Sequence, residues 1–81
     1  MAEFKEIEAM IAEVKSHANR LQLVINHVNG KEYVVEPKDN SSDEWLLGMG
    51  EESIIGWNAI QDTITEWYNE GKIKRVYVDS L

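Results

Sequence analysis

The dipeptide Asn29-Gly30 constrains the fold of this chain more than any other feature of the sequence. It lies within residues 21–36, where Leu, Val, Ile and Tyr recur on both sides of it. Asn-Gly between two such runs is the strongest short-range signal for a β-hairpin, because a type I′ turn needs positive φ at both central residues. A two-residue turn also fixes the register of the strands. The predicted cross-strand pairs are Val28 with Lys31, Asn26 with Tyr33 and Val24 with Val35.

This register predicts that both faces of the hairpin are partly apolar. An antiparallel sheet with one solvated face normally alternates apolar and polar residues. Two helices on one side of a sheet cannot cover two apolar faces, so we expect a partner chain, a neighbouring loop or a dimer mate to cover one of them. One face carries Leu21, Leu23, Ile25 and Val34, and the other carries Val24, Val28, Tyr33 and Val35.

Two segments have the periodicity of amphipathic helices, with apolar residues at steps of three and four. The first covers residues 2–19. The second begins at Trp57 and ends before Gly71, which suits the left-handed position after a helix. We expect Trp67, on the apolar side of the second helix, to lie in the core. The first stripe comprises Phe4, Ile7, Met10, Ile11, Val14 and Ala18, and the second comprises Trp57, Ile60, Ile64, Trp67 and Tyr68.

The remaining segments complete an α+β pattern. Pro37 lacks a backbone N–H and is expected to close the second strand, while residues 44–49 and 72–78 predict two further strands. Residues 51–56 are compatible with a short strand or with an early helical turn. The resulting order is α-β-β-β-α-β in a single domain, residues 1–81, with a mainly antiparallel sheet and both helices packed on one face. A right-handed crossover would allow the last strand to pair parallel with a neighbour.

Composition narrows the classes of function. Fifteen acidic residues against eight basic ones give a formal net charge of −7. This balance disfavours direct contact with nucleic acid or with an anionic membrane, and it speeds encounter with a basic protein. The absence of cysteine excludes disulfides, Cys-based zinc sites and thiol nucleophiles. No apolar run approaches the roughly 20 residues of a spanning helix, so we expect a cytoplasmic protein.

The sequence offers little for catalysis. His17 and His27 are its only histidines, and the predicted register puts Glu32 opposite His27. A His–Glu pair can support acid–base chemistry, and Glu36 would add a third metal ligand, although no recognised ligand spacing supports one. We therefore predict no catalytic residues, no metal and no cofactor. A small acid–base enzyme centred on His27 is the alternative.

An acidic stretch, residues 36–52, is the better lead to function. It carries six carboxylates and one lysine around the apolar residues of the third predicted strand. If its loops lie at opposite ends of that strand, the carboxylates are about 15–20 Å apart and could imitate the spaced phosphates of a nucleic acid. Solvated loops that merely enclose a buried strand give the same composition. The carboxylates are Glu36, Asp39, Asp43, Glu44, Glu51 and Glu52.

These features favour a small, acidic, non-enzymatic protein-binding module. Its sharpest form is an inhibitor that acts as a DNA mimic and blocks a basic nucleic-acid-binding protein, of anti-restriction or anti-CRISPR type, encoded by a phage or another mobile element. The alternative is a small subunit or a homodimeric structural protein that covers an apolar sheet face. The predicted partner surface comprises the acidic stretch together with Val24, Val28, Tyr33 and Val35.

Overall fold

The computed structural model describes residues 4–17, 20–37, 44–49 and 52–80. Two helices and five strands follow one another in these ranges, which confirms the α+β class, and the segment whose structure the sequence left open forms a strand, β4. No helix in the described part of the chain combines the length and the apolar character needed to cross a membrane. In chain order the elements are α1 (Phe4–Ser16), β1 (Leu21–His27), β2 (Glu32–Pro37), β3 (Trp45–Met49), β4 (Glu52–Ile55), α2 (Trp57–Asn69) and β5 (Ile73–Ser80).

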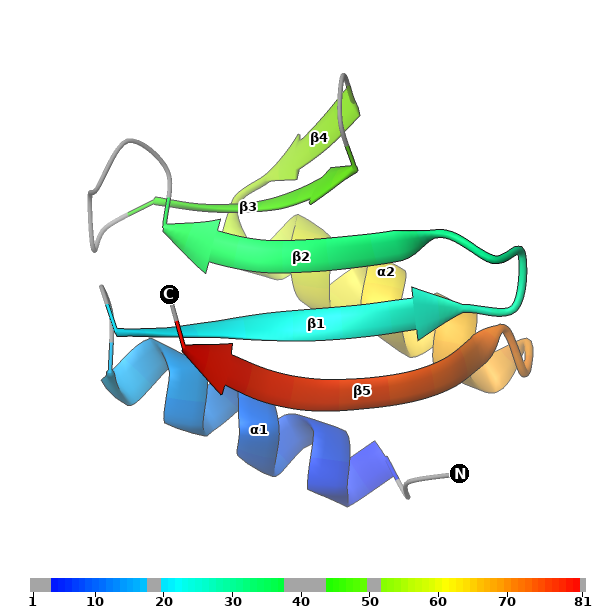
Figure 1. The fold of residues 1–81 in the computed structure, drawn as a ribbon, viewed down its shortest axis with the longest axis horizontal. Helices are drawn as coiled ribbons and strands as arrows, with labels where there is room; N and C mark the ends of the chain where they lie inside the picture. Colours follow the sequence, from blue (N-terminus) through cyan, green and yellow to red (C-terminus); the bar gives the residue numbers. More distant parts are fainter. Residues whose placement is uncertain (1–3, 18–19, 38–43, 50–51, 81) are drawn as a thin grey trace.

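The strands form one antiparallel sheet in the order β4-β3-β2-β1-β5, and both helices pack on the same face of it (Figure 1). We call this face the inner face and the opposite one the outer face. A parallel pairing of the last strand is wrong, because β5 runs antiparallel to β1. The Val28 N–H donates to the Lys72 carbonyl at 2.9 Å. This bond shows that β5 starts beside the hairpin end of β1 and runs back along it.

The inner face and the two helical stripes form the hydrophobic core. One row of side chains crosses all five strands, because the pairing places Val78, Leu23, Val35, Leu47 and Ile54 side by side. Full burial of one such side chain stabilises the fold by about 1.5–3 kcal/mol, so this layer supplies much of the driving force for folding. The helical residues buried against it are Ile7, Ile11, Val14, Ile60 and Ile64.

The hairpin forms at Asn29-Gly30, but its predicted register is wrong by one residue. The loop has three residues, since the His27 N–H donates to the Lys31 carbonyl at 2.9 Å and the Gly30 N–H donates to the His27 carbonyl at 3.0 Å. Gly30 has a φ of 89°, which fits a type I turn followed by a left-handed glycine. A shift of one residue moves every side chain of β2 to the other face. The observed pairs are Leu23 with Val35, Val24 with Val34, Ile25 with Tyr33 and Asn26 with Glu32.

Gly71 ends α2, as predicted, and sets the direction of β5. Its φ is 70°, and its N–H donates to the Tyr68 carbonyl at 3.1 Å. The next N–H, of Lys72, donates to the Trp67 carbonyl at 2.9 Å. These two bonds make a Schellman motif, which satisfies the last helical carbonyls and turns the chain back toward the sheet.

The three Trp side chains are buried to different degrees. Trp45 is 2% exposed and packs 4.9 Å from the Trp57 ring. The Lys15 Nζ lies 4.9 Å from the Trp57 ring centroid, a cation–π contact that joins the end of α1 to the start of α2. Trp67 packs against the core but stays partly exposed. It therefore lies at the edge of the core rather than inside it.

Candidate functional site

No helix in the described ranges covers the outer face of the sheet (Figure 1). Apolar side chains nevertheless gather there. Tyr77, Val24 and Val34 form one row across β5, β1 and β2. Leu46 and Ile55 form a second row on β3 and β4. We call these five residues the outer-face patch.

The patch is partly closed by its own side chains. Val24 is 3% exposed although no helix lies over it, because Tyr77 and Val34 flank it directly. Ile55, on the short edge strand β4, is 47% exposed. Gly48 lacks a side chain, and a hollow of about 440 Å³ lies over it. The other residues that line this hollow are Gln22, Val34, Glu36, Leu46 and Ser53.

Charged side chains of both signs lie around the patch in the described strands. The register places Glu32, Glu36 and Asp79 on the outer face together with Arg75. The Arg75 guanidinium carbon lies 4.5 Å from the Tyr77 ring centroid. This contact holds the guanidinium over the β5 end of the patch. The surface is therefore apolar in the middle, acidic at Glu36 and Asp79, and mainly basic at the hairpin end, where Lys31, Lys74 and Arg75 line a hollow with Glu32.

Only one residue of the predicted apolar set, Val24, lies on the outer face. Val28 is in the hairpin loop and is 57% exposed. Tyr33 and Val35 were predicted on the partner surface, but they face the core. Val35 is fully buried, and the Tyr33 ring lies 4.7 Å from the Trp67 ring. The physical reason is the three-residue loop, which turns both side chains inward.

The acids of residues 36–52 that the structure describes are separated along β3. Glu36 is half-buried on the outer face, opposite Leu46. Glu44 is exposed immediately before β3, whereas Glu52 lies opposite Met49 at the other end of that strand. The described acids are therefore spread along β3 and do not converge on one point. Three of the predicted site residues lie outside the described residues: Asp39, Asp43 and Glu51.

The sequence reasoning missed four of the five patch residues, but it contained a signal for them. Gly30 can be read as the single left-handed residue of a three-residue loop, and that reading puts Val34 opposite Val24. Leu46 then follows from alternation along β3, because Trp45 and Leu47 on either side of it are buried. The missed residues are Val34, Leu46, Ile55 and Tyr77.

His27 is held in a cluster of rings at the hairpin end of the inner face. It is 9% exposed, and its ring lies 5.0 Å from Trp67 and 5.7 Å from Tyr33. Its Nδ1 accepts a hydrogen bond from the Asn29 N–H at 3.1 Å, which requires a lone pair on this nitrogen. These contacts make His27 a packing residue that also secures the loop.

The structure does not bring the predicted His–Glu pair together. Lys31, not Glu32, lies across from His27. Glu32 and Glu36 are on the outer face, while His27 is on the inner face. Among the described residues, no group of three or more His, Cys, Asp or Glu side chains is placed to hold a metal ion. His27 therefore forms no acid–base pair with Glu32 or Glu36.

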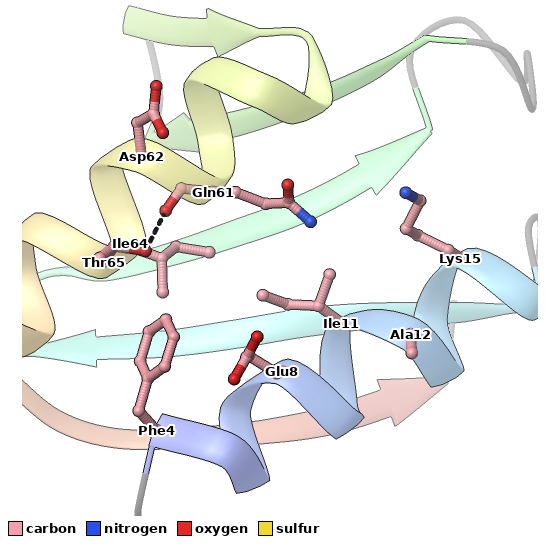
Figure 2. Close-up of a pocket in the computed structure, with 9 residues that line it drawn as sticks. All are labelled: Phe4, Glu8, Ile11, Ala12, Lys15, Gln61, Asp62, Ile64 and Thr65. Atoms are coloured by element: carbon pink, nitrogen blue, oxygen red, sulfur yellow. Dashed lines mark hydrogen bonds between the residues drawn. The ribbon is translucent and has the colours of Figure 1, made fainter.

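A groove of about 400 Å³ lies between α1 and α2 (Figure 2). Ile11 and Ile64 project toward it from the two helices and form an apolar floor. Glu8, Lys15 and Asp62 also line it, so its charges are of both signs. This mixture favours no single class of ligand.

The fold and the outer-face patch define a two-layer α+β protein with an open antiparallel sheet face. Comparisons with protein-family models, with curated proteins and with solved structures found no significant match to this chain.

Proposed function

We propose that this chain is a small, non-enzymatic protein-binding module whose outer sheet face docks a basic protein in the cytoplasm. The observation that carries the proposal is the outer-face patch, an apolar surface with no helix of the described chain over it and with Ile55 strongly exposed. Apolar patches with a polar rim are typical of protein interaction sites. Tyr77 with Arg75 stacked on it combines two residue types that often dominate binding energy.

Charge defines the kind of partner. Glu32, Glu36 and Asp79 lie on the outer face beside the patch, and the whole chain has a net charge of −7. Such a field attracts a basic surface and raises the association rate. Proteins that bind nucleic acid carry Lys and Arg side chains clustered on their surface. We therefore propose a nucleic-acid-binding protein as the partner.

The sharpest form of the proposal is a DNA mimic of the anti-restriction or anti-CRISPR kind. The separation of Glu44 and Glu52 supports it, because Glu44 precedes β3 at one end and Glu52, the first residue of β4, pairs with Met49 at the other. Their backbones are about 15–20 Å apart by strand rise. Carboxylates at such a spacing can occupy positions that phosphates take in a basic groove. The outer-face patch would then add apolar contact beside the acids.

The test compares two exposed apolar residues that differ in position. Ile55 belongs to the outer-face patch, whereas Val28 lies in the hairpin loop. The partner is first captured from a lysate and then purified. Ile55→Arg should weaken its binding about tenfold or more, because it puts a cation where a basic surface docks. Val28→Arg should leave the affinity near the wild-type value.

Both variants should keep the wild-type melting temperature, because the substituted side chains are exposed. Equal affinities of the two variants for the purified partner would contradict the outer face as the docking site. An affinity that stays constant as the salt concentration rises would contradict a partner chosen by charge.

A further inference from the structure

The longest strand, β5, has an open edge in the described chain. It spans eight residues and pairs with β1 along one side only. Helix α1 contacts β1 and β5 from the inner face and runs along the β5 margin (Figure 1). Among the described residues no strand pairs with this margin. The opposite margin of the sheet, β4, has only four residues. A long edge strand is a template for pairing with another strand.

The pairing pattern shows which backbone groups β5 presents at this edge. The His27 N–H donates toward β2 at the hairpin, so alternate residues of β1, including Val24, direct their backbone groups toward β5. Val24 lies opposite Tyr77, which makes Tyr77 a residue bonded to β1. The N–H and C=O groups of its neighbours Val76 and Val78 therefore point toward the open edge.

We propose that a second copy of this chain pairs antiparallel with β5 across this edge, about a two-fold axis at Tyr77. In this register Val76 lies opposite Val78 of the second copy. The outward N–H of each of these residues donates to the C=O of the other. Arg75 lies opposite Asp79 of the second copy, and the symmetry repeats this pair. Tyr77 meets its own counterpart at a non-hydrogen-bonded position, where side chains are close.

Charge favours this register over the one with its axis at Val76. An axis one residue earlier would put Arg75 opposite Tyr77 and would leave Asp79 opposite Ile73. The axis at Tyr77 instead joins two exposed residues of opposite charge, Arg75 and Asp79. Opposite charges directly across an antiparallel pair are stabilising, and like charges are destabilising.

Charged residues on an edge strand often prevent pairing, and Lys74 and Arg75 are such residues. The register of β5 against β1 shifts between Arg75 and Ile73, so the proposed pairing is confined to residues 75–79, where Arg75 lies opposite Asp79 and meets no like charge. The pairing joins two five-stranded sheets into one and makes the outer faces of both copies continuous through Tyr77. It does not rest on the proposed function, because it uses the backbone edge of β5, joins two copies of this chain and needs no basic partner protein.

Analytical ultracentrifugation of the full chain at concentrations from about 10 µM to about 1 mM tests the pairing. This range is high because an interface made mainly by one pair of edge strands is small and is expected to be weak. The wild type should pass from monomer to dimer over this range. Arg75→Asp puts a carboxylate opposite the Asp79 carboxylate of the second copy, and Asp79→Arg puts a cation opposite Arg75. Each variant should therefore raise the dimer dissociation constant about tenfold or more. The double variant Arg75→Asp/Asp79→Arg restores opposite charges and should restore the wild-type constant.

Backbone hydrogen exchange gives a second readout on the wild type. The N–H groups of Val76 and Val78 should gain protection as the concentration rises, whereas that of Tyr77, already bonded to β1, should change little. A monomer at every concentration overturns the proposal. A dimer also overturns it if both single charge reversals leave it intact, or if Val76 and Val78 stay unprotected, because such a dimer uses another surface.

Discussion

The Tyr33 and Trp67 rings lie with their centroids 4.7 Å apart, and this contact joins β2 to the C-terminal half of α2. His27 packs edge-on to the same indole at 5.0 Å. Ile60 and Ile64 anchor α2 nearer its start. Trp67 therefore fixes the last turns of the helix against the hairpin end of the sheet.

Truncation of Trp67 should loosen this end of the molecule. We expect Trp67→Ala to lower the free energy of unfolding by about 2–4 kcal/mol, somewhat less than the truncation of a fully buried Trp, because the side chain is partly exposed. Urea unfolding measures the loss. Glu66→Ala, at an exposed position of the same helix, is the control and should change little. Equal stability of the two variants would mean that the ring contacts contribute nothing.

Two neighbouring leucines test the register of the sheet. Leu47 is 3% exposed in the central inner row, whereas Leu46 lies half-buried on the outer face. Leu47→Ala should cost about 2–5 kcal/mol of stability, and Leu46→Ala should cost about 1 kcal/mol or less because much of its surface is already wet. Thermal melts of both variants decide the matter. A larger loss at Leu46 than at Leu47 would mean that β3 presents the opposite face to the helices.

The hairpin loop can be tested at Gly30. Its φ of 89° is costly for a residue with a Cβ, although a Cβ placed there meets no atom within 4 Å. Gly30→Ala should therefore destabilise the fold by about 1–2 kcal/mol through backbone strain alone. Gly30→Asn should cost less, because Asn adopts left-handed conformations more readily. Denaturant unfolding measures the stability of both variants. If both had the free energy of unfolding of the wild type, the result would contradict the three-residue loop.

The sequence was sufficient for the order of every element except β4, because each of the others carries its own local signal, whereas residues 51–56 fit a strand or a helical turn. The stripes of α1 and α2 have a helical period, Asn29-Gly30 marks the hairpin, and Gly71 marks the end of α2. The register of the hairpin has no such local signal in the sequence. Asn-Gly fits both a two-residue and a three-residue loop, and the choice between them reverses the face of every residue in β2.

The candidate surface was harder to predict than the fold for that reason. Val24 lies on the outer face, but Tyr33 and Val35, predicted on the same face as Val24, lie on the inner face because the predicted register of β2 is wrong. Tyr77 and Ile55 belong to the patch only because β5 and β4 take their places in the sheet. Strand order is a property of the whole fold, and no short segment of the chain encodes it.

The acidic stretch of residues 36–52 gives the last prediction, which separates a specific role of these acids from a general effect of charge. A partner with a basic groove should respond to where the negative charges lie as well as to how many there are. Neutralising five acids of the stretch should slow association at low salt, and the difference from the wild type should shrink as salt rises. The variant replaces Asp39, Asp43, Glu44, Glu51 and Glu52 by Asn or Gln.

A matched variant removes the same five charges from the exposed surfaces of the helices and serves as the control. Both variants have the same net charge, so a field that merely steers the partner would slow both equally. Slower association of the acidic-stretch variant alone would support the DNA mimic, because its acids would then contact the groove. Equal rates for the two variants would reject the mimic and leave the stretch as solvated chain around β3, since isolated surface charges contribute little. The control replaces Glu6, Glu8, Glu13, Asp62 and Glu66, all exposed on α1 and α2.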